Sequence, residues 1–213
     1  MEPITQKNSL YKWAYVLAVI TILYNLIEGI VSVFLGLQDE TLSLFGFGVD
    51  SFVEVISGIG IWHMLIRIKH EGNLDKFEKT ALRITGTSFY VLVAGLIVTS
   101  IYNGIIDHKP ETTFWGIIIS LISIVTMGSL IYYKMKIGKA LDSDALIADA
   151  NCTKTCFYLS IILLAASVGY ELTGIGRFDS IGALLIAYFS FKEGREAFEK
   201  AKSGKYCTRD DDK

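Results

Sequence analysis

The chain has 213 residues, of which 52% are hydrophobic, and its formal net charge is −2. Its mean hydropathy of +0.45 is too high for an ordinary soluble domain of this length, so membrane-spanning helices are the first interpretation. A nearly neutral charge lacks the basic footprint of a nucleic-acid-binding protein, and we expect no nucleic acid among the partners. The three cysteines do not form the framework of a small secreted domain.

Six apolar runs follow one another along the chain. The first five lie near residues 14–37, 41–66, 84–106, 112–133 and 145–170. Each is longer than the roughly 20 residues needed to cross about 30 Å of hydrocarbon. The sixth run, 178–191, is shorter but continues at helical spacing into "KEGREAFEKAKSGK", with Lys192 at the interface. The sequence therefore predicts an all-α membrane protein: six transmembrane helices over residues 1–200 and a short polar cytosolic tail over 201–213.

The positions of the basic residues predict the orientation of the spans. Seventeen of the 20 Lys and Arg residues lie in the two termini and in the connections on the same side as the termini. Three of these 17, Lys134, Lys136 and Lys139, fall between the fourth and fifth spans. The opposite connections hold two, Lys109 and Arg177. Because basic connections stay in the cytosol, we expect both termini to be cytosolic in a multi-pass protein of the plasma (inner) membrane.

Few ionisable or thiol side chains fall inside the spans, and each is a candidate for function because it is costly in hydrocarbon. They are Glu28, Asp50, Glu54, Asp149, Cys152, Lys154 and Cys156. Asp50 and Glu54 share one helical face because they are four residues apart, and Cys152 and Cys156 do so for the same reason. The carboxylates lie 9 and 13 residues from the outer start of the second span, and the cysteines 7 and 11 from the inner start of the fifth. Both pairs therefore fall near the middle of the membrane, where two antiparallel helices could present four ligands to one point.

Two carboxylates and two thiolates suit a tetrahedral divalent ion such as zinc. A bound cation would also neutralise acidic groups that are costly to bury while ionised and unpaired. Because the ligands must lose their protons to bind, metal binding should release protons. This linkage is a physical basis for exchanging a metal ion for protons, with no permanently bound cofactor.

Other interpretations of these residues remain open. A cysteine in a membrane helix is often only a small apolar residue. Glu28 could be a proton relay, an additional ligand, or a residue that lines a wet cavity. Asp149 could orient its neighbours rather than bind metal, and Lys154 is expected to point away from the cysteine face. Glycines in the second span, such as Gly48, are expected to let neighbouring helices approach closely.

Three motifs resemble the cation diffusion facilitator (cation efflux) family. "DSFVEVISG" in the second span looks like that family's second-helix metal motif, "SDALIADANCTKTC" like its fifth-helix motif, and "FDSIGALLIAYFSFKEGREAF" like its sixth helix. The resemblance covers about residues 11–200. It implies a divalent-metal exporter, most often for zinc, that exchanges the metal for protons and forms a homodimer. It also places Asp50, Glu54, Cys152 and Cys156 on the four positions of the transport site.

The chain departs from the family's pattern in two places. Cys152 stands where the family usually has histidine, and Cys156 where it usually has aspartate. Sulfur ligands make cadmium, mercury or copper(I) plausible beside zinc. The chain also resembles a short form without the family's cytosolic C-terminal domain, which normally contributes to dimerisation.

We therefore expect a secondary transporter rather than an enzyme. Two alternatives stay open: a membrane protein that binds metal without transporting it, and a membrane thiol oxidoreductase that uses Cys152 and Cys156. The second is disfavoured because cysteines four residues apart on a helix are poorly placed for a disulfide, and because it leaves Asp50 and Glu54 unexplained.

Overall fold

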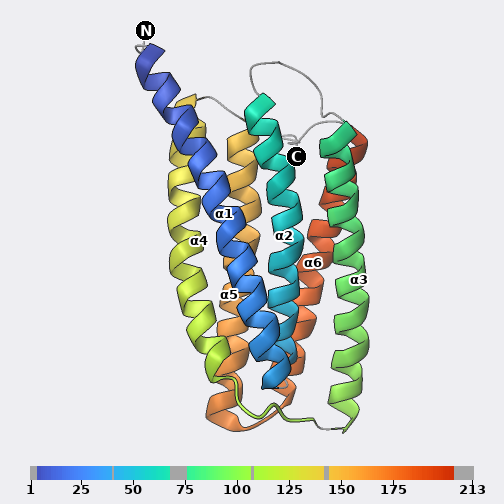
Figure 1. Cartoon of the computed structure of the whole chain (residues 1–213). Coiled ribbons are helices and arrows are strands. Elements are labelled where there is room, and N and C mark those ends of the chain that lie inside the picture. Colours follow the sequence, from blue (N-terminus) through green and yellow to red (C-terminus); the bar gives the residue numbers. More distant parts are fainter. Residues whose placement is uncertain (1–3, 40, 68–75, 107, 142–143, 204–213) are drawn as a thin grey trace, which may run out of the picture.

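The computed structural model describes residues 4–39, 41–67, 76–106, 108–141 and 144–203. Within these ranges the chain forms six α-helices and no strand, and the helices stand side by side in one bundle (Figure 1). They are α1 (Ile4–Gln38), α2 (Leu42–Arg67), α3 (Lys76–Ile106), α4 (Phe114–Leu141), α5 (Asp144–Thr173) and α6 (Arg177–Ser203). Each predicted span corresponds to one helix, so the all-α prediction is confirmed. Most of the predicted tail, residues 204–213, lies outside the described residues.

The outer surface of the bundle is suited to lipid. Five of the described helices, α1 to α5, are long and apolar enough to cross a membrane. Large apolar side chains such as Ile27, Phe34, Val91 and Val125 point outward and are mostly exposed. Such a surface is unfavourable in water but matches hydrocarbon. The helix α6 is not apolar enough over a sufficient length to belong to this group, because charged residues fill its second half.

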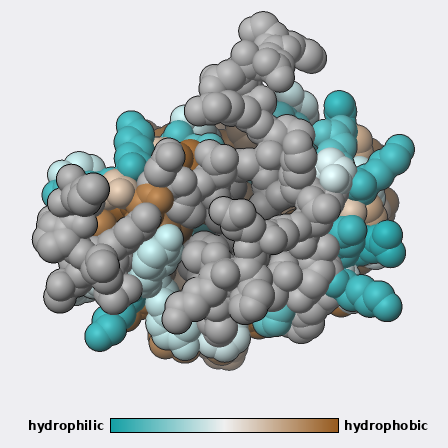
Figure 2. All heavy atoms as spheres, turned by 90° about the horizontal axis from the view of Figure 1, so that it is seen from above, coloured by the Kyte–Doolittle hydropathy of each residue, from teal (hydrophilic) through white to brown (hydrophobic). Residues whose placement is uncertain are grey.

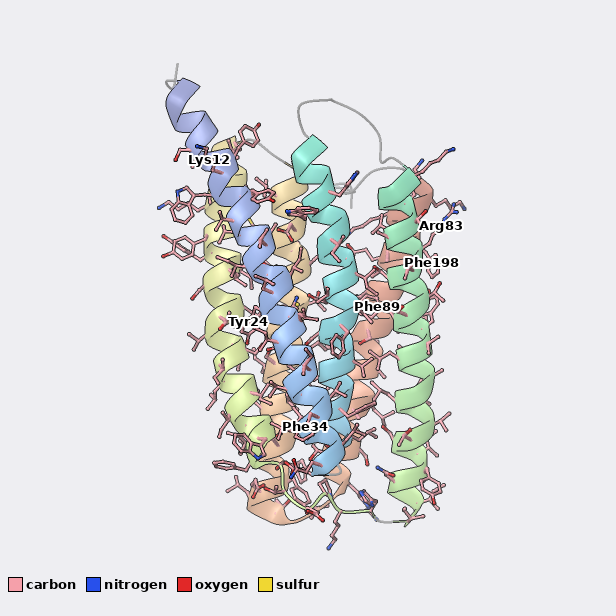
Figure 3. All side chains as sticks on the ribbon, in the orientation of Figure 1. Lys12, Tyr24, Phe34, Arg83, Phe89 and Phe198 are labelled. Atoms are coloured by element: carbon pink, nitrogen blue, oxygen red, sulfur yellow. The ribbon has the colours of Figure 1, made fainter. Side chains whose placement is uncertain are left out.

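The bundle has two distinct ends. The helix α1 begins and α6 finishes at the same end, which we call the terminal end, and the opposite one is the far end (Figure 1). Lys12 and Arg83 are exposed near the terminal end (Figure 3). Viewed from this end, hydrophilic side chains lie around the rim (Figure 2). By the distribution of Lys and Arg, the terminal end is the one predicted to face the cytosol.

Two apolar clusters hold the bundle together, one in each half. The cluster toward the far end includes Leu44, Phe47 and Ile186, and the cluster toward the terminal end includes Leu17 and Met127. The most extensive helix contacts are those of α1 with α2, α3 with α6, and α4 with α5. Buried polar residues such as Asn25 and Glu28 lie on α1 between the parts of this helix that pack against the two clusters, and Asp50 lies on α2 just past the part that enters the far-end cluster.

The crossing of α1 and α2 depends on a glycine. A Cβ atom on Gly48 would lie 2.7 Å from the backbone nitrogen of Val33 and 2.8 Å from the Cβ of Ser32. No side chain fits in that space, which is why the two backbones can pack directly against each other. This contact brings the polar face of α1 against the predicted ligands of α2.

The first turn of α2 is capped from another helix. Asp179 of α6 accepts hydrogen bonds from the backbone N–H groups of Leu42, at 2.8 Å, and Ser43, at 2.9 Å, and from the Ser43 hydroxyl. A carboxylate at a helix N-terminus satisfies N–H groups that have no partner within the helix. The contact ties α2 to α6 at the far end.

The prediction for Lys134 is wrong. The sequence pattern assigns it to a connection on the terminal side, but α4 continues to Leu141 and places Lys134 inside the bundle, with 1% of its surface exposed. The ammonium group is accommodated there because Asp149 of α5 binds it. Lys136 and Lys139 are exposed, as expected for that end.

Candidate metal centre

The antiparallel helices α2 and α5 bring two of the four predicted ligands together. The Oε2 atom of Glu54 lies 2.5 Å from the Sγ atom of Cys156. Asp50 is one turn closer to the far end and is almost fully buried, with 2% of its surface exposed. Its Oδ1 atom accepts a hydrogen bond from the Ser190 hydroxyl of α6 at 2.7 Å. A thiol and two carboxylates from two helices thus occupy the polar middle of the bundle.

Cys152, the fourth predicted ligand, points elsewhere. Its Sγ atom lies 3.8 Å from the Nζ atom of Lys200 on α6. Among the residues that the structure describes, no three His, Cys, Asp or Glu side chains lie close enough together to hold a metal ion as they stand. Glu54 links Cys156 and Cys152, because it contacts Cys156 and also lines a small cavity that Cys152 lines, which is described below.

The helix α1 adds a second polar layer beside these residues. Glu28 is buried, and its carboxylate accepts hydrogen bonds from the Tyr24 hydroxyl at 2.9 Å and the Ser51 hydroxyl at 3.1 Å. Figure 3 shows Tyr24 at mid-height on α1. Asn25 donates its amide N–H to Glu54 at 3.4 Å, while its Oδ1 atom accepts no hydrogen bond from any described residue. The predicted accessory residue Glu28 is therefore close to the centre and held by hydrogen bonds.

Asp149, the other predicted accessory residue, is committed to an ion pair. Its carboxylate lies 2.9 Å from the Nζ atom of Lys134, which also donates to the Thr153 hydroxyl at 3.0 Å. A buried carboxylate whose charge is balanced by a fixed ammonium group is a poor metal ligand. The arrangement favours the role of orienting α5 over that of binding metal.

A cavity of about 40 Å³ lies on the terminal side of Glu54, among α2, α3, α5 and α6. Its ionisable and thiol lining comes from Glu54, Asp149, Cys152, Glu193 and Lys200. A cavity of this volume can hold a few water molecules or one partly hydrated ion. It extends from the middle of the membrane toward the terminal end, where these stretches of α5 and α6 lie (Figure 1).

Sequence reasoning missed the contribution of α6. Ser190, Glu193 and Lys200 all face the polar interior, and the first two contact Asp50 and Thr155. The signal was present, since residues 190, 193, 197 and 200 follow one helical face. It was overlooked because this stretch reads as the solvated end of a helix.

The apolar outer surface and the buried polar centre define an integral, multi-pass membrane protein. Residues 14–203 match the model of the cation efflux transmembrane domain. The chain belongs to the cation efflux family, which confirms the resemblance carried by the motifs in its second, fifth and sixth helices.

Two relatives show how far the likeness extends. The chain is 27% identical over 194 residues to the manganese efflux system protein MneP of Bacillus subtilis, covering 84% of this chain and 64% of that protein. It is 24% identical over 177 residues to the uncharacterized transporter MJ0449 of Methanocaldococcus jannaschii, covering 79% of this chain and 62% of that protein. The chain thus spans just under two thirds of the length of either relative.

Proposed function

We propose that the chain is a secondary transporter that exports a divalent metal cation from the cytosol, across the plasma (inner) membrane, in exchange for protons. The observation that carries the proposal is the contact between Glu54 of α2 and Cys156 of α5, next to buried Asp50. These residues lie on the two helices whose motifs resemble the family's metal motifs. Asp50, Glu54, Cys152 and Cys156 are the proposed metal ligands, and they bind together once Cys152 turns from Lys200 toward Glu54.

Zinc is the proposed substrate, with cadmium and mercury as softer alternatives. The name of the relative MneP specifies manganese, an ion that prefers oxygen ligands. The two cysteines of this chain argue for a softer ion, because thiolate sulfur binds zinc and cadmium well. The free state of both thiols leaves them able to bind metal.

Proton exchange follows from the chemistry of the ligands. Carboxylates and thiols buried in the middle of a membrane bundle hold protons when no cation balances their charge. Metal binding releases those protons, and the returning protons reset the site for the next cycle. Glu28, which touches Ser51 of the ligand-bearing helix, is the proposed relay. As the family resemblance implies, the transporter is proposed to work as a homodimer.

The test is metal flux into proteoliposomes that contain a zinc-sensitive dye, with a pH-sensitive dye in parallel. We expect zinc uptake coupled to opposite proton movement in the wild type, and loss of most of the flux in Asp50→Asn and Cys156→Ala. The matched control is Glu199→Gln, which removes an exposed carboxylate whose partner is Arg195 on the surface of α6. Undiminished flux in both ligand variants contradicts the proposal. Zinc binding without flux in the wild type supports the alternative of a metal-binding protein that does not transport.

Selectivity is tested separately with zinc, cadmium and manganese. The double variant Cys152→His with Cys156→Asp replaces both sulfur ligands by the residues usual in the family. We expect it to lose cadmium transport relative to zinc, because imidazole and carboxylate are harder ligands than thiolate. If the order of preference does not move, sulfur does not set the selectivity.

A further inference from the structure

The cavity beside Glu54 has the chemistry of a cation site, although two of its charged lining residues, Glu193 and Lys200, come from a helix outside the family's metal motifs. From α2 and α5 it receives the carboxylate of Glu54 and the thiol of Cys152. From α6 it receives the carboxylate of Glu193. Asp149 also reaches the cavity, but its charge is balanced by Lys134. The groups left to bind a cation are therefore Glu54, Cys152 and Glu193. They must draw together around the ion, since no three such side chains among the described residues can hold a metal as they stand.

Glu193 is held in place and lies close to the proposed ligands. Its Oε1 atom accepts a hydrogen bond from the Thr155 hydroxyl of α5 at 2.7 Å. Glu193 lines the same cavity as Glu54 and Cys152. A carboxylate with one oxygen fixed by a hydroxyl group keeps its other oxygen available for a metal ion.

A positive charge already occupies the wall of this cavity. Lys200 is 8% exposed, and its Nζ atom lies 3.8 Å from Cys152 Sγ and 2.7 Å from Glu196 Oε1. The ammonium group thus lies where a cation bound by Cys152 would be. Glu196 is about half exposed. Because the lysine side chain is a flexible four-carbon stem, the Lys200 ammonium group can move away from Cys152 toward the terminal end while it stays paired with Glu196.

We propose that Glu193, Cys152 and Glu54 form a loading site for the divalent metal, on the terminal side of the Asp50–Glu54–Cys156 position. Until metal binds, the Lys200 ammonium group stands in for it by supplying the positive charge at this site. The inference rests on the proposed function and extends it by one binding step. An arriving ion displaces the Lys200 ammonium from Cys152 and binds between the α5 thiol and the α6 carboxylate. Glu54 and Cys152 then belong to both the loading site and the four-ligand transport site, and Glu54, which contacts Cys156, passes the ion on toward the middle of the bundle.

The decisive variant is Glu193→Gln in the purified full chain. The amide preserves the size of the side chain and can still accept the Thr155 hydrogen bond, but it removes the negative charge. Zinc affinity, measured by competition with a chromogenic chelator, is expected to fall by about tenfold or more, with an unchanged unfolding temperature. The matched control Glu199→Gln, on the exposed face of the same helix, is expected to leave both values unchanged.

Lys200→Met gives a second, opposite readout. Removing the competing ammonium is expected to lower the zinc Kd and to strengthen the ultraviolet thiolate-to-cadmium absorption when cadmium is the probe. An unchanged zinc Kd in Glu193→Gln overturns the ligand role, and an unchanged or higher Kd in Lys200→Met overturns the stand-in role. A shift in unfolding temperature alone would assign Glu193 a structural role, which also overturns the inference.

Asp50→Asn separates this inference from the function on which it rests. If the wild type binds and transports zinc, Asp50→Asn abolishes transport and Glu193→Gln has no effect, only the loading site is wrong. If the wild type neither binds nor transports zinc, cadmium or manganese, the proposed function fails and the loading site fails with it.

Discussion

At the scale of single residues, each of the two buried lysines that the structure describes has a carboxylate partner. Lys134 of α4 pairs with Asp149 of α5, while Lys200 of α6 pairs with Glu196 of its own helix and also lies 3.8 Å from the Cys152 thiol of α5. Each ammonium group lies within one or two turns of the proposed metal ligands. In the proposed transporter, these contacts limit the charge imbalance of the interior before a divalent cation arrives.

The Lys134–Asp149 pair is expected to be essential as a pair and replaceable as a whole. Lys134→Met leaves an unpaired carboxylate in the interior, and we expect a loss of about 3–5 kcal/mol in the free energy of unfolding. The double variant Lys134→Met with Asp149→Leu removes both charges and should recover most of that loss. The measurement is the unfolding of purified protein in detergent, followed by circular dichroism.

Lys136→Met is the matched control for this cycle, because Lys136 is two residues away on the exposed side of α4. It should change stability by less than about 0.5 kcal/mol. If Lys134→Met is as mild as the control, the pair contributes nothing to the fold, and the orienting role of Asp149 is wrong.

At the scale of the helices, most of the fold could be predicted, because hydrophobic length alone separates the spans. The bounds of α2, predicted as 41–66 and observed as Leu42–Arg67, show how sharply composition can mark a membrane helix. The positions of the ligand pairs along the second and fifth spans also predict that the two pairs lie at one depth, and Glu54 of α2 does contact Cys156 of α5. The sequence could not predict which residues of α6 the proposed ligands on α2 and α5 contact. Cys152 turns toward Lys200, and spacing within α5 carries no information about α6.

The α1–α2 crossing is the element-scale contact most sensitive to a small change. We expect Gly48→Ala to cost about 1–3 kcal/mol, because the new Cβ atom would collide with the backbone of α1 at Val33. The helices must separate to relieve the clash, which moves Asn25 away from Glu54. The measurements are the unfolding temperature and the zinc affinity of the variant.

Gly95→Ala on α3 is the control for that substitution, since a Cβ atom there would meet nothing within 4 Å. Alanine favours helix over glycine, so this variant should be neutral or slightly more stable. Equal effects of the two substitutions would mean that glycine at position 48 is not needed for the crossing.

At the scale of the whole molecule, the two ends of the bundle differ in how far they are closed. Toward the far end, an apolar cluster that includes Leu44 and Phe47 fills the interior, and Asp179 fastens the start of α2 to α6. Toward the terminal end, the cavity reaches up from Glu54 between α5 and α6. This asymmetry is what an alternating-access transporter presents when its site is accessible from one side only.

The closed far end and the open cavity lead to a prediction about access to the cysteines. In a Cys207→Ser background, which removes the cysteine outside the described residues, a membrane-impermeant maleimide should label Cys152 in inside-out vesicles and not in right-side-out ones. Cys156, with 5% of its surface exposed, should react far more slowly than Cys152, as single-cysteine variants would measure. Zinc should protect Cys152, because a metal-bound thiolate is no longer a free nucleophile.

Labelling of Cys152 from the outer side alone would mean that the terminal end is not cytosolic. Equal labelling from both sides would mean that the far end does not close the path, so that the cavity cannot serve as one side of an alternating cycle.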